Sequence, residues 1–167
     1  MSERVLQGHH LDTNFKSEEL LRFPNDLYIQ LKKDFPRNQT NLMRQAYTFA
    51  SKAHDGQERM DGKPYISHPL EVARILVEMN MDVDSICAGL MHDVLEDCNI
   101  EKRNIDKIFG KDVSEIVDGV SKIGKLDFQS KAERDINSFQ KMALAMAKDV
   151  RVIVAVSYTH LTLPTKA

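Results

Sequence analysis

The sequence predicts an all-α fold. Apolar residues recur at helical spacing after residues of the types that cap helix N-termini, and signals for strands are scarce. The 167 residues are 42% apolar and include seven Gly, without a long low-complexity stretch, so the chain can bury one core. We therefore expect a single helical domain.

Two helices are expected in the N-terminal part, after a loose arm. Residues 1–24 are polar and lack periodicity, which indicates the arm. A short helix is expected over residues 26–33, ended by Pro36, and a longer one over residues 41–55, stopped by Gly56. The helical domain is therefore expected to start at about residue 25.

The middle helices are expected over residues 67–79 and from Asp84 onward. Ser67 follows a loop marked by Gly and Pro and suits the N-cap of the first of these helices, where Pro69 fits the first turn. Asp84 suits the cap of the second helix, which carries His92.

Shorter helices are expected further along the chain. Residues 100–109 are expected to form one, with Gly110 in the C-terminal stop position, and residues 112–122 the next. Residues 130–133 have the pattern of a capping box and are expected to open another helix.

Four metal-ligand side chains occur within six positions: His92, Asp93, Glu96 and Asp97. On one helix, residues three and four apart share a face, so Asp93 can lie beside Glu96 and Asp97. Burying such groups among apolar neighbours is costly without a cation, which favours a metal site. The ion stays open between Mn, Fe, Zn and Mg, and the alternative is a surface or capping pair.

Two further histidines lie near helix ends. His68 lies at the entrance of the helix expected over residues 67–79, as a candidate ligand or as a residue that only caps the loop. His54 ends the helix expected over residues 41–55, and we expect it to be a core or supporting residue rather than a ligand.

Several motifs, in order, resemble the hydrolase domain of the RelA/SpoT-type alarmone enzymes over roughly residues 40–155. The matching segments are residues 46–57, 62–69, 91–97, 109–113, 117–122, 141–146 and 149–153. The resemblance implies an all-helical HD-type bundle that uses one Mn²⁺ to remove the 3′-pyrophosphate from ppGpp or pppGpp. It also implies that a synthetase domain and regulatory domains follow in the full-length protein, which is expected to associate with the ribosome or with regulatory proteins.

The resemblance also implies a role for each matching residue. His68, His92 and Asp93 match the metal ligands, whereas Glu96 and Asp97 match the acidic pair that assists the attacking water. A divalent cation with a nearby carboxylate is a sensible arrangement for that hydrolysis. The alternative for the acidic pair is a solvated helix end.

Two basic residues of the loop before His68 are candidates for binding substrate. Arg59 resembles the basic residue of the family that faces the nucleotide, and polyanionic substrates need such cations. The next position departs from the family, which often has a second basic residue where this chain has Met60. Lys63 is expected to compensate, although Arg59 alone is also typical of a solvated loop charge.

The last residues depart from the family. Extending the register places Thr159 where the family has an aspartate as fourth metal ligand, with His160 one place off. A DNA string that resembles a transposase-type sequencing adapter translates to residues 156–165. We therefore expect a non-native tail over residues 156–167 and a C-terminally incomplete HD domain over residues 25–155. The β-branched residues before the tail favour a strand by propensity, but the resemblance implies a helix over residues 150–155.

Composition narrows the class of function. A net charge of −2, from 23 basic and 25 acidic residues that are intermixed, gives no basic face for general nucleic-acid binding. No apolar run of membrane-spanning length and no leader are evident, so we expect a cytoplasmic protein. The spacing of Cys87 and Cys98 favours neither a disulfide framework nor a thiolate zinc site. Besides alarmone hydrolysis, another nucleotide phosphohydrolase and a non-catalytic module remain open.

Overall fold

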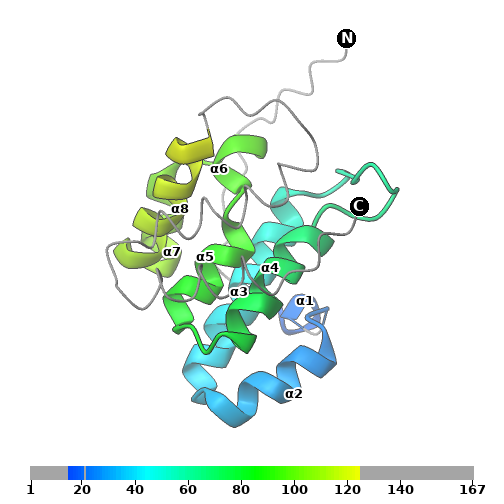
Figure 1. Ribbon diagram of the computed structural model, residues 1–167, viewed down its shortest axis with the longest axis vertical. Helices are drawn as coiled ribbons and strands as arrows, with labels where there is room; N and C mark the ends of the chain where they lie inside the picture. Colours follow the sequence, from blue (N-terminus) through cyan, green and yellow to red (C-terminus); the bar gives the residue numbers. More distant parts are fainter. Residues whose placement is uncertain (1–14, 21, 125–167) are drawn as a thin grey trace.

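The structure is a computed structural model that describes residues 15–20 and 22–124 (Figure 1). The helices in this part of the chain are α1 (Ser17–Leu20), α2 (Asn25–Asp34), α3 (Arg37–Ala53), α4 (Ser67–Glu78), α5 (Val83–Met91), α6 (Val94–Asp97), α7 (Lys102–Phe109) and α8 (Lys111–Gly124). Among these residues the β-type pairing is an isolated bridge between Glu58 and Pro64. The prediction of an all-α fold is confirmed.

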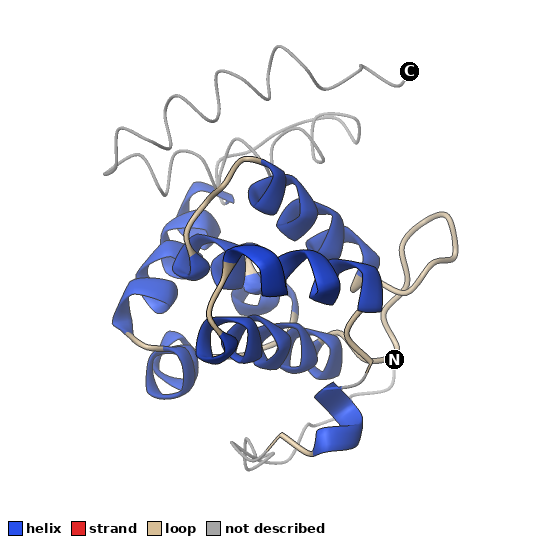
Figure 2. Cartoon of the chain, turned by 90° about the horizontal axis from the view of Figure 1, so that it is seen from below, coloured by secondary structure: helices blue, strands red, loops and turns tan. Residues whose placement is uncertain are grey.

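Helix α5 lies in the middle of the bundle. It packs against α3, α4 and α8 (Figure 1), and Figure 2 shows that helices joined by loops build the described part of the chain. Every position from Ser85 to Met91 is buried, so this helix has no solvated face. Its sequence explains the position, because Ala88 and Gly89 allow neighbouring helices to approach closely while Ile86 and Leu90 fill the space around them. The end of α5 is therefore held firmly on all sides.

Helix α3 contributes the other large share of the core. Met43, Ala46, Phe49 and Ala50 are spaced three and four residues apart and are all buried. Phe49 meets Phe109 of α7 edge to face, with ring centroids 5.5 Å apart. The apolar stripe of α3 thus joins α5 to the α7–α8 pair.

The N-terminal arm was predicted to lack structure, which is wrong for its last residues. Helix α1 lies against α3, where the Arg44 guanidinium donates to the Leu20 carbonyl from Nε at 3.2 Å and from Nη2 at 2.8 Å. The Lys52 ammonium lies 2.8 Å from the Glu19 carboxylate. These partners come from a helix more than twenty residues away, so periodicity within the arm could not reveal them.

Three predicted helix starts also need correction. Helix α3 begins at Arg37, directly after Pro36, because the fixed φ of proline suits a helix entrance. Ser67 is already helical, and its hydroxyl donates to the Pro64 carbonyl rather than capping α4. The cap of α5 is Asp82, whose carboxylate accepts from the Ser85 N–H at 2.9 Å, and not Asp84.

The single helix expected to carry His92 through Asp97 is in fact two helices. Helix α5 ends at Met91, and α6 restarts at Val94 after a turn formed by His92 and Asp93. The Asp93 carbonyl accepts from the N–H groups of Glu96 and Asp97, which starts the new helix. Both residues keep backbone angles in the right-handed helical region, with φ −60° and ψ −28° at His92 and φ −98° and ψ −6° at Asp93.

The turn between α7 and α8 agrees with the prediction. Gly110 follows Phe109 with φ of +91°, a conformation that favours glycine. The capping box predicted at residues 130–133 and the helix predicted at residues 150–155 lie outside the described residues. No described helix combines the length and the apolar character that crossing a membrane requires.

Candidate metal centre

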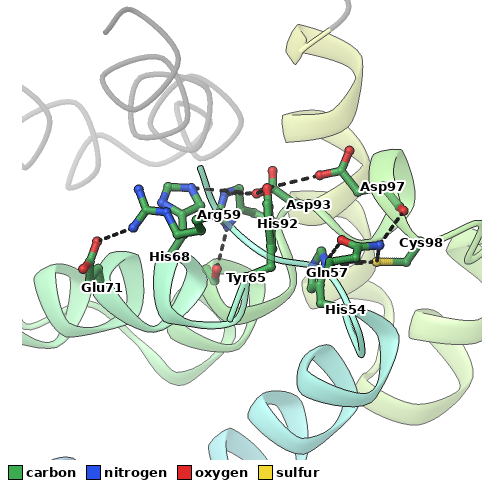
Figure 3. Close-up of polar contacts among 11 residues, drawn as sticks. His54, Gln57, Arg59, Tyr65, His68, Glu71, His92, Asp93, Asp97 and Cys98 are labelled. Atoms are coloured by element: carbon green, nitrogen blue, oxygen red, sulfur yellow. Dashed lines mark hydrogen bonds and ion pairs between the residues drawn. The ribbon is translucent and has the colours of Figure 1, made fainter. Parts of the chain in front are cut away.

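Three of the predicted ligands meet at one point. His68 comes from the first turn of α4, whereas His92 and Asp93 come from the turn between α5 and α6 (Figure 3). One donor atom from each lies within 4.8 Å of the others. Asp93 Oδ2 is 3.0 Å from His92 Nε2 and 3.8 Å from His68 Nε2. Two imidazole nitrogens and a carboxylate oxygen facing one another are a suitable donor set for a divalent metal ion.

The orientation of His92 supports this assignment. Its Nδ1 lies 2.8 Å from the Gly89 carbonyl, so Nδ1 carries the proton and donates it. The opposite nitrogen, Nε2, is buried and faces Asp93 Oδ2 at 3.0 Å, but it makes no well-directed hydrogen bond among the described residues. A buried nitrogen whose hydrogen bonding is left incomplete is costly. A metal ion would use this lone pair, and the Gly89 carbonyl would fix the ring as metal sites usually require.

The charges at the site are strongly coupled. Burial alone would lower the pKa of His92, but the negative charge of Asp93 outweighs it, so the pKa is raised. Burial likewise works against ionisation of Asp93, yet the neighbouring His92 and His68 hold its pKa well below the usual range. The two side chains thus form a buried ion pair, and a divalent cation would replace the imidazole proton as the partner of Asp93.

The two acidic residues of α6 lie one turn beyond the ligands, and both are exposed. Burial of part of its carboxyl and the charge of Asp93 raise the pKa of Asp97. The negative charge of Glu96 is close enough to contribute to the raised pKa of His92. The acidic pair is therefore beside the candidate metal centre, on its solvent side.

The loop of residues 57–65 carries the two basic candidates. It turns back on itself, with the Arg59 N–H donating to the Lys63 carbonyl at 2.8 Å. The Arg59 guanidinium lies 3.4 Å from the Glu71 carboxylate of α4, three residues beyond His68, which holds Arg59 over the first turn of that helix. Lys63 is more exposed, 3.9 Å from the Asp61 carboxylate. Met60, at the tip, is 81% exposed.

A layer of side chains supports the ligands, and its member Tyr65 was not predicted from the sequence, unlike His54. The Tyr65 hydroxyl donates to Asp93 Oδ2 at 2.7 Å and to Asp97 Oδ2 at 3.2 Å. Its ring stacks on His54, with centroids 4.4 Å apart. Tyr65 lies three residues before His68, and that spacing is the one signal in the sequence that could have indicated its position.

His54 belongs to this supporting layer and lies outside the group of three donors. It is buried, and its Nδ1 lies 2.9 Å from Gln57 Oε1 and 3.2 Å from the thiol of Cys98. Gln57 Nε2 in turn donates to the Asp97 carbonyl at 3.2 Å. Burial raises the pKa of the Cys98 thiol to about 12, so Cys98 stays protonated in the metal-free site, and it lies outside the group of three donors.

The fold and the site together define an all-α domain in which side chains suited to a divalent metal ion converge from separate helices. The family model described as "HD domain" matches residues 46–162. The chain belongs to the HD domain family. The predicted fourth ligand position, Thr159, and the predicted non-native tail lie outside the described residues.

The curated relatives narrow the subfamily. The chain is 50% identical over 116 residues to guanosine-3′,5′-bis(diphosphate) 3′-pyrophosphohydrolase of Vibrio cholerae, a match that covers 70% of this chain and 16% of the relative. It is 47% identical over 119 residues to the bifunctional (p)ppGpp synthase/hydrolase SpoT of Escherichia coli K12, a match that covers 71% of this chain and 17% of that relative. It is 41% identical over 122 residues to a GTP pyrophosphokinase of Myxococcus xanthus, a match that covers 71% of this chain and 16% of that relative.

These matches confirm the resemblance to the RelA/SpoT-type enzymes that the motifs indicated. The matched region is a small part of each relative, since the chain spans 16 to 17% of their length. What the relatives' names say about reaction and substrate therefore applies to those proteins and supports a proposal for this chain.

Proposed function

We propose that this domain hydrolyses the 3′-pyrophosphate of ppGpp and pppGpp and releases pyrophosphate. The observation that carries the proposal is the His68, His92 and Asp93 cluster with two carboxylates one turn beyond it. The names of the relatives from Vibrio cholerae and Escherichia coli supply the substrate class. A metal-type site with carboxylates beside it is a suitable arrangement for hydrolysis of a phosphate ester.

In this proposal His68, His92 and Asp93 hold one Mn²⁺. When bound, the ion lowers the pKa of a coordinated water and neutralises charge on the phosphate oxygens. His92 presents Nε2 to it because the Gly89 carbonyl fixes the other nitrogen. Asp93 presents the oxygen that faces both imidazoles.

Glu96 and Asp97 are proposed to orient the attacking water and to accept its proton. Both belong to the single turn of α6, directly after the ligand Asp93. The raised pKa of Asp97, caused by burial and by the charge of Asp93, favours retention of a proton once it is accepted.

Arg59 and Lys63 are proposed to bind the phosphates of the substrate. Arg59 now pairs with Glu71, and an incoming phosphate would compete for the same guanidinium. Lys63 extends from the exposed turn of the same loop. The ion pair with Glu71 places Arg59 beside α4, the helix that carries His68.

A second candidate is an HD phosphohydrolase that acts on another nucleotide. It is favoured by Met60, which is exposed at the tip of the loop where many relatives of this type are expected to have a basic residue. A panel of nucleotides separates the two candidates, because alarmone hydrolysis requires ppGpp to be turned over faster than nucleotides without a 3′-pyrophosphate.

We also propose a wider setting for the domain. The relatives named as synthase/hydrolase and as pyrophosphokinase support a place within a longer bifunctional enzyme of the cytoplasm. Association with the ribosome or with regulatory proteins belongs to that proposal and would involve the longer protein.

The test is Mn²⁺-dependent release of pyrophosphate from ppGpp by two proteins. One is this chain, and the other has the residues after position 155 replaced by a helix that carries an aspartate in the register of Thr159. Activity in the second protein only supports both the hydrolase and the proposed non-native tail. Activity in both proteins supports the proposed hydrolase activity and shows that three ligands suffice without the aspartate in the register of Thr159. Activity in neither overturns the proposed reaction.

A further inference from the structure

Tyr65 connects the two halves of the site. Its hydroxyl is 2.7 Å from Asp93 Oδ2 and 3.2 Å from Asp97 Oδ2, so one O–H group has two carboxylate acceptors (Figure 3). Asp93 belongs to the three-donor cluster and Asp97 to the acidic pair. Among the interactions found in the described residues, this hydroxyl links the side chains of the two groups directly.

The hydroxyl contacts the oxygen that matters most for metal binding. Asp93 Oδ2 is the same atom that lies 3.0 Å from His92 Nε2 and 3.8 Å from His68 Nε2. A carboxylate oxygen has two lone pairs, so it can accept from Tyr65 and still face a cation. The hydrogen bond fixes which oxygen of Asp93 points at the imidazoles.

The ring of Tyr65 is itself held in place. It stacks on His54 with an interplanar angle of 27°, and it meets the His68 ring edge-on with centroids 6.2 Å apart. His54 is anchored through Gln57, which also donates to the Asp97 carbonyl. Tyr65 and Gln57 thus reach Asp97 at its side chain and its backbone respectively, and both depend on the loop of residues 57–65.

We infer that Tyr65 is a positioning residue that sets the relation between the metal ligand Asp93 and the carboxylate of Asp97. A cation on Asp93 Oδ2 makes that oxygen a weaker acceptor, so the Tyr65 hydroxyl then donates more strongly to Asp97. Loading of the metal is thereby coupled to the orientation of the acidic pair. The catalytic part of this inference rests on the proposed function, whereas the part that concerns metal affinity does not.

The test compares Tyr65→Phe with Tyr47→Phe in the full chain. Tyr65→Phe keeps the ring on His54 and removes the hydroxyl. The control removes a hydroxyl from a buried tyrosine whose ring packs edge-on against Phe23, with centroids 5.3 Å apart. Calorimetric titration with Mn²⁺ is expected to show a Kd about tenfold higher for Tyr65→Phe, the usual effect of losing a residue that orients a ligand. The control is expected to bind like the parent chain.

Two further readouts separate positioning from general stability. Without metal, Tyr65→Phe should still unfold in a single cooperative transition, because the ring contacts with His54 and His68 are kept. With ppGpp, kcat should fall while KM stays the same. If the parent chain does not hydrolyse ppGpp, the proposed function fails and the Kd comparison still decides the role of Tyr65. Equal binding of Mn²⁺ by the two variants, including no binding by either, would overturn the inference.

Discussion

Replacement of the Asp93 carboxylate by an amide is expected to destabilise the metal-free protein at acidic pH more than at alkaline pH. Asp93→Asn keeps the shape of the side chain and an oxygen that can accept from Tyr65. It removes the charge that raises the pKa of the buried His92. The buried imidazolium is then left without its partner.

The pH window follows from the directions of the two pKa shifts. The pKa of His92 is raised above its usual 6.5, so its contribution to stability is complete below that pH and disappears as the pH rises through the folded pKa. The pKa of Asp93 is lowered below its usual 3.8, so its contribution is complete above that pH and is lost in stronger acid. The ion pair therefore stabilises the fold between these limits.

The magnitude follows from burial. Removing one partner of a buried ion pair costs about 3–5 kcal/mol. The side chain of His92 is 1% exposed and that of Asp93 is 14% exposed. Solvent reaches Asp93 slightly, so we expect a loss of about 2–3 kcal/mol at about pH 5.5 and a much smaller loss at about pH 9.

The assay is urea unfolding in the presence of a chelator at both pH values. Asp26→Asn is a matched control, because Asp26 makes an exposed pair with Arg74 at 2.8 Å. Such pairs contribute little, so the control should change the free energy of unfolding little and equally at both pH values. Equal destabilisation by Asp93→Asn at both pH values would refute the assignment of a buried His92–Asp93 ion pair.

Three other substitutions test the site and the fold. His92→Ala should abolish binding of Mn²⁺ and hydrolysis together, as followed by calorimetry and pyrophosphate release, and a variant that keeps both would remove His92 from the ligand set. Glu96→Gln should bind the ion normally but lower kcat by about 100-fold, whereas loss of metal would make Glu96 a ligand. Gly110→Ala should lower the free energy of unfolding by about 1 kcal/mol in a urea titration, because φ is +91° although the new Cβ meets no atom within 4 Å; an unchanged midpoint would contradict backbone strain there.

The sequence predicted the helical elements where local signals and tertiary packing agree. Gly110 ends α7 as expected. A glycine after an amphipathic segment is a local signal for a helix end that does not depend on the tertiary contacts of the helix. The helix starts were less well predicted. Ser67 and Asp84 have the residue types of N-caps, but Ile66 and Asp82 occupy those positions, because the approach of the preceding loop decides which residue is first in the helix.

The candidate site was predicted in part. The resemblance to the RelA/SpoT-type enzymes implied that His68, His92 and Asp93 hold the metal, and the structure brings their donor atoms together. Tyr65 and Gln57 were missed because their contacts join residues 28 to 40 positions apart, to Asp93 and Asp97. Neither contact produces a periodicity, and a tyrosine or glutamine in a loop has no fixed role in sequence patterns.

The break between α5 and α6 shows why sequence reasoning found the ligands but not their geometry. Leu90, Met91, Val94 and Leu95 continue the helical pattern of apolar residues across the break, and neither Gly nor Pro marks it. Adjacent side chains on a helix point about 100° apart, so the spacing alone does not predict that their donor atoms meet.

In the turn, His92 Nε2 and Asp93 Oδ2 come within 3.0 Å. Two features hold them there: the Gly89 carbonyl on the opposite nitrogen of His92 and the Tyr65 hydroxyl on Asp93. The turn between α5 and α6 is therefore part of the site, because it carries two consecutive ligand residues whose side chains these contacts orient, while α5 stays buried behind them.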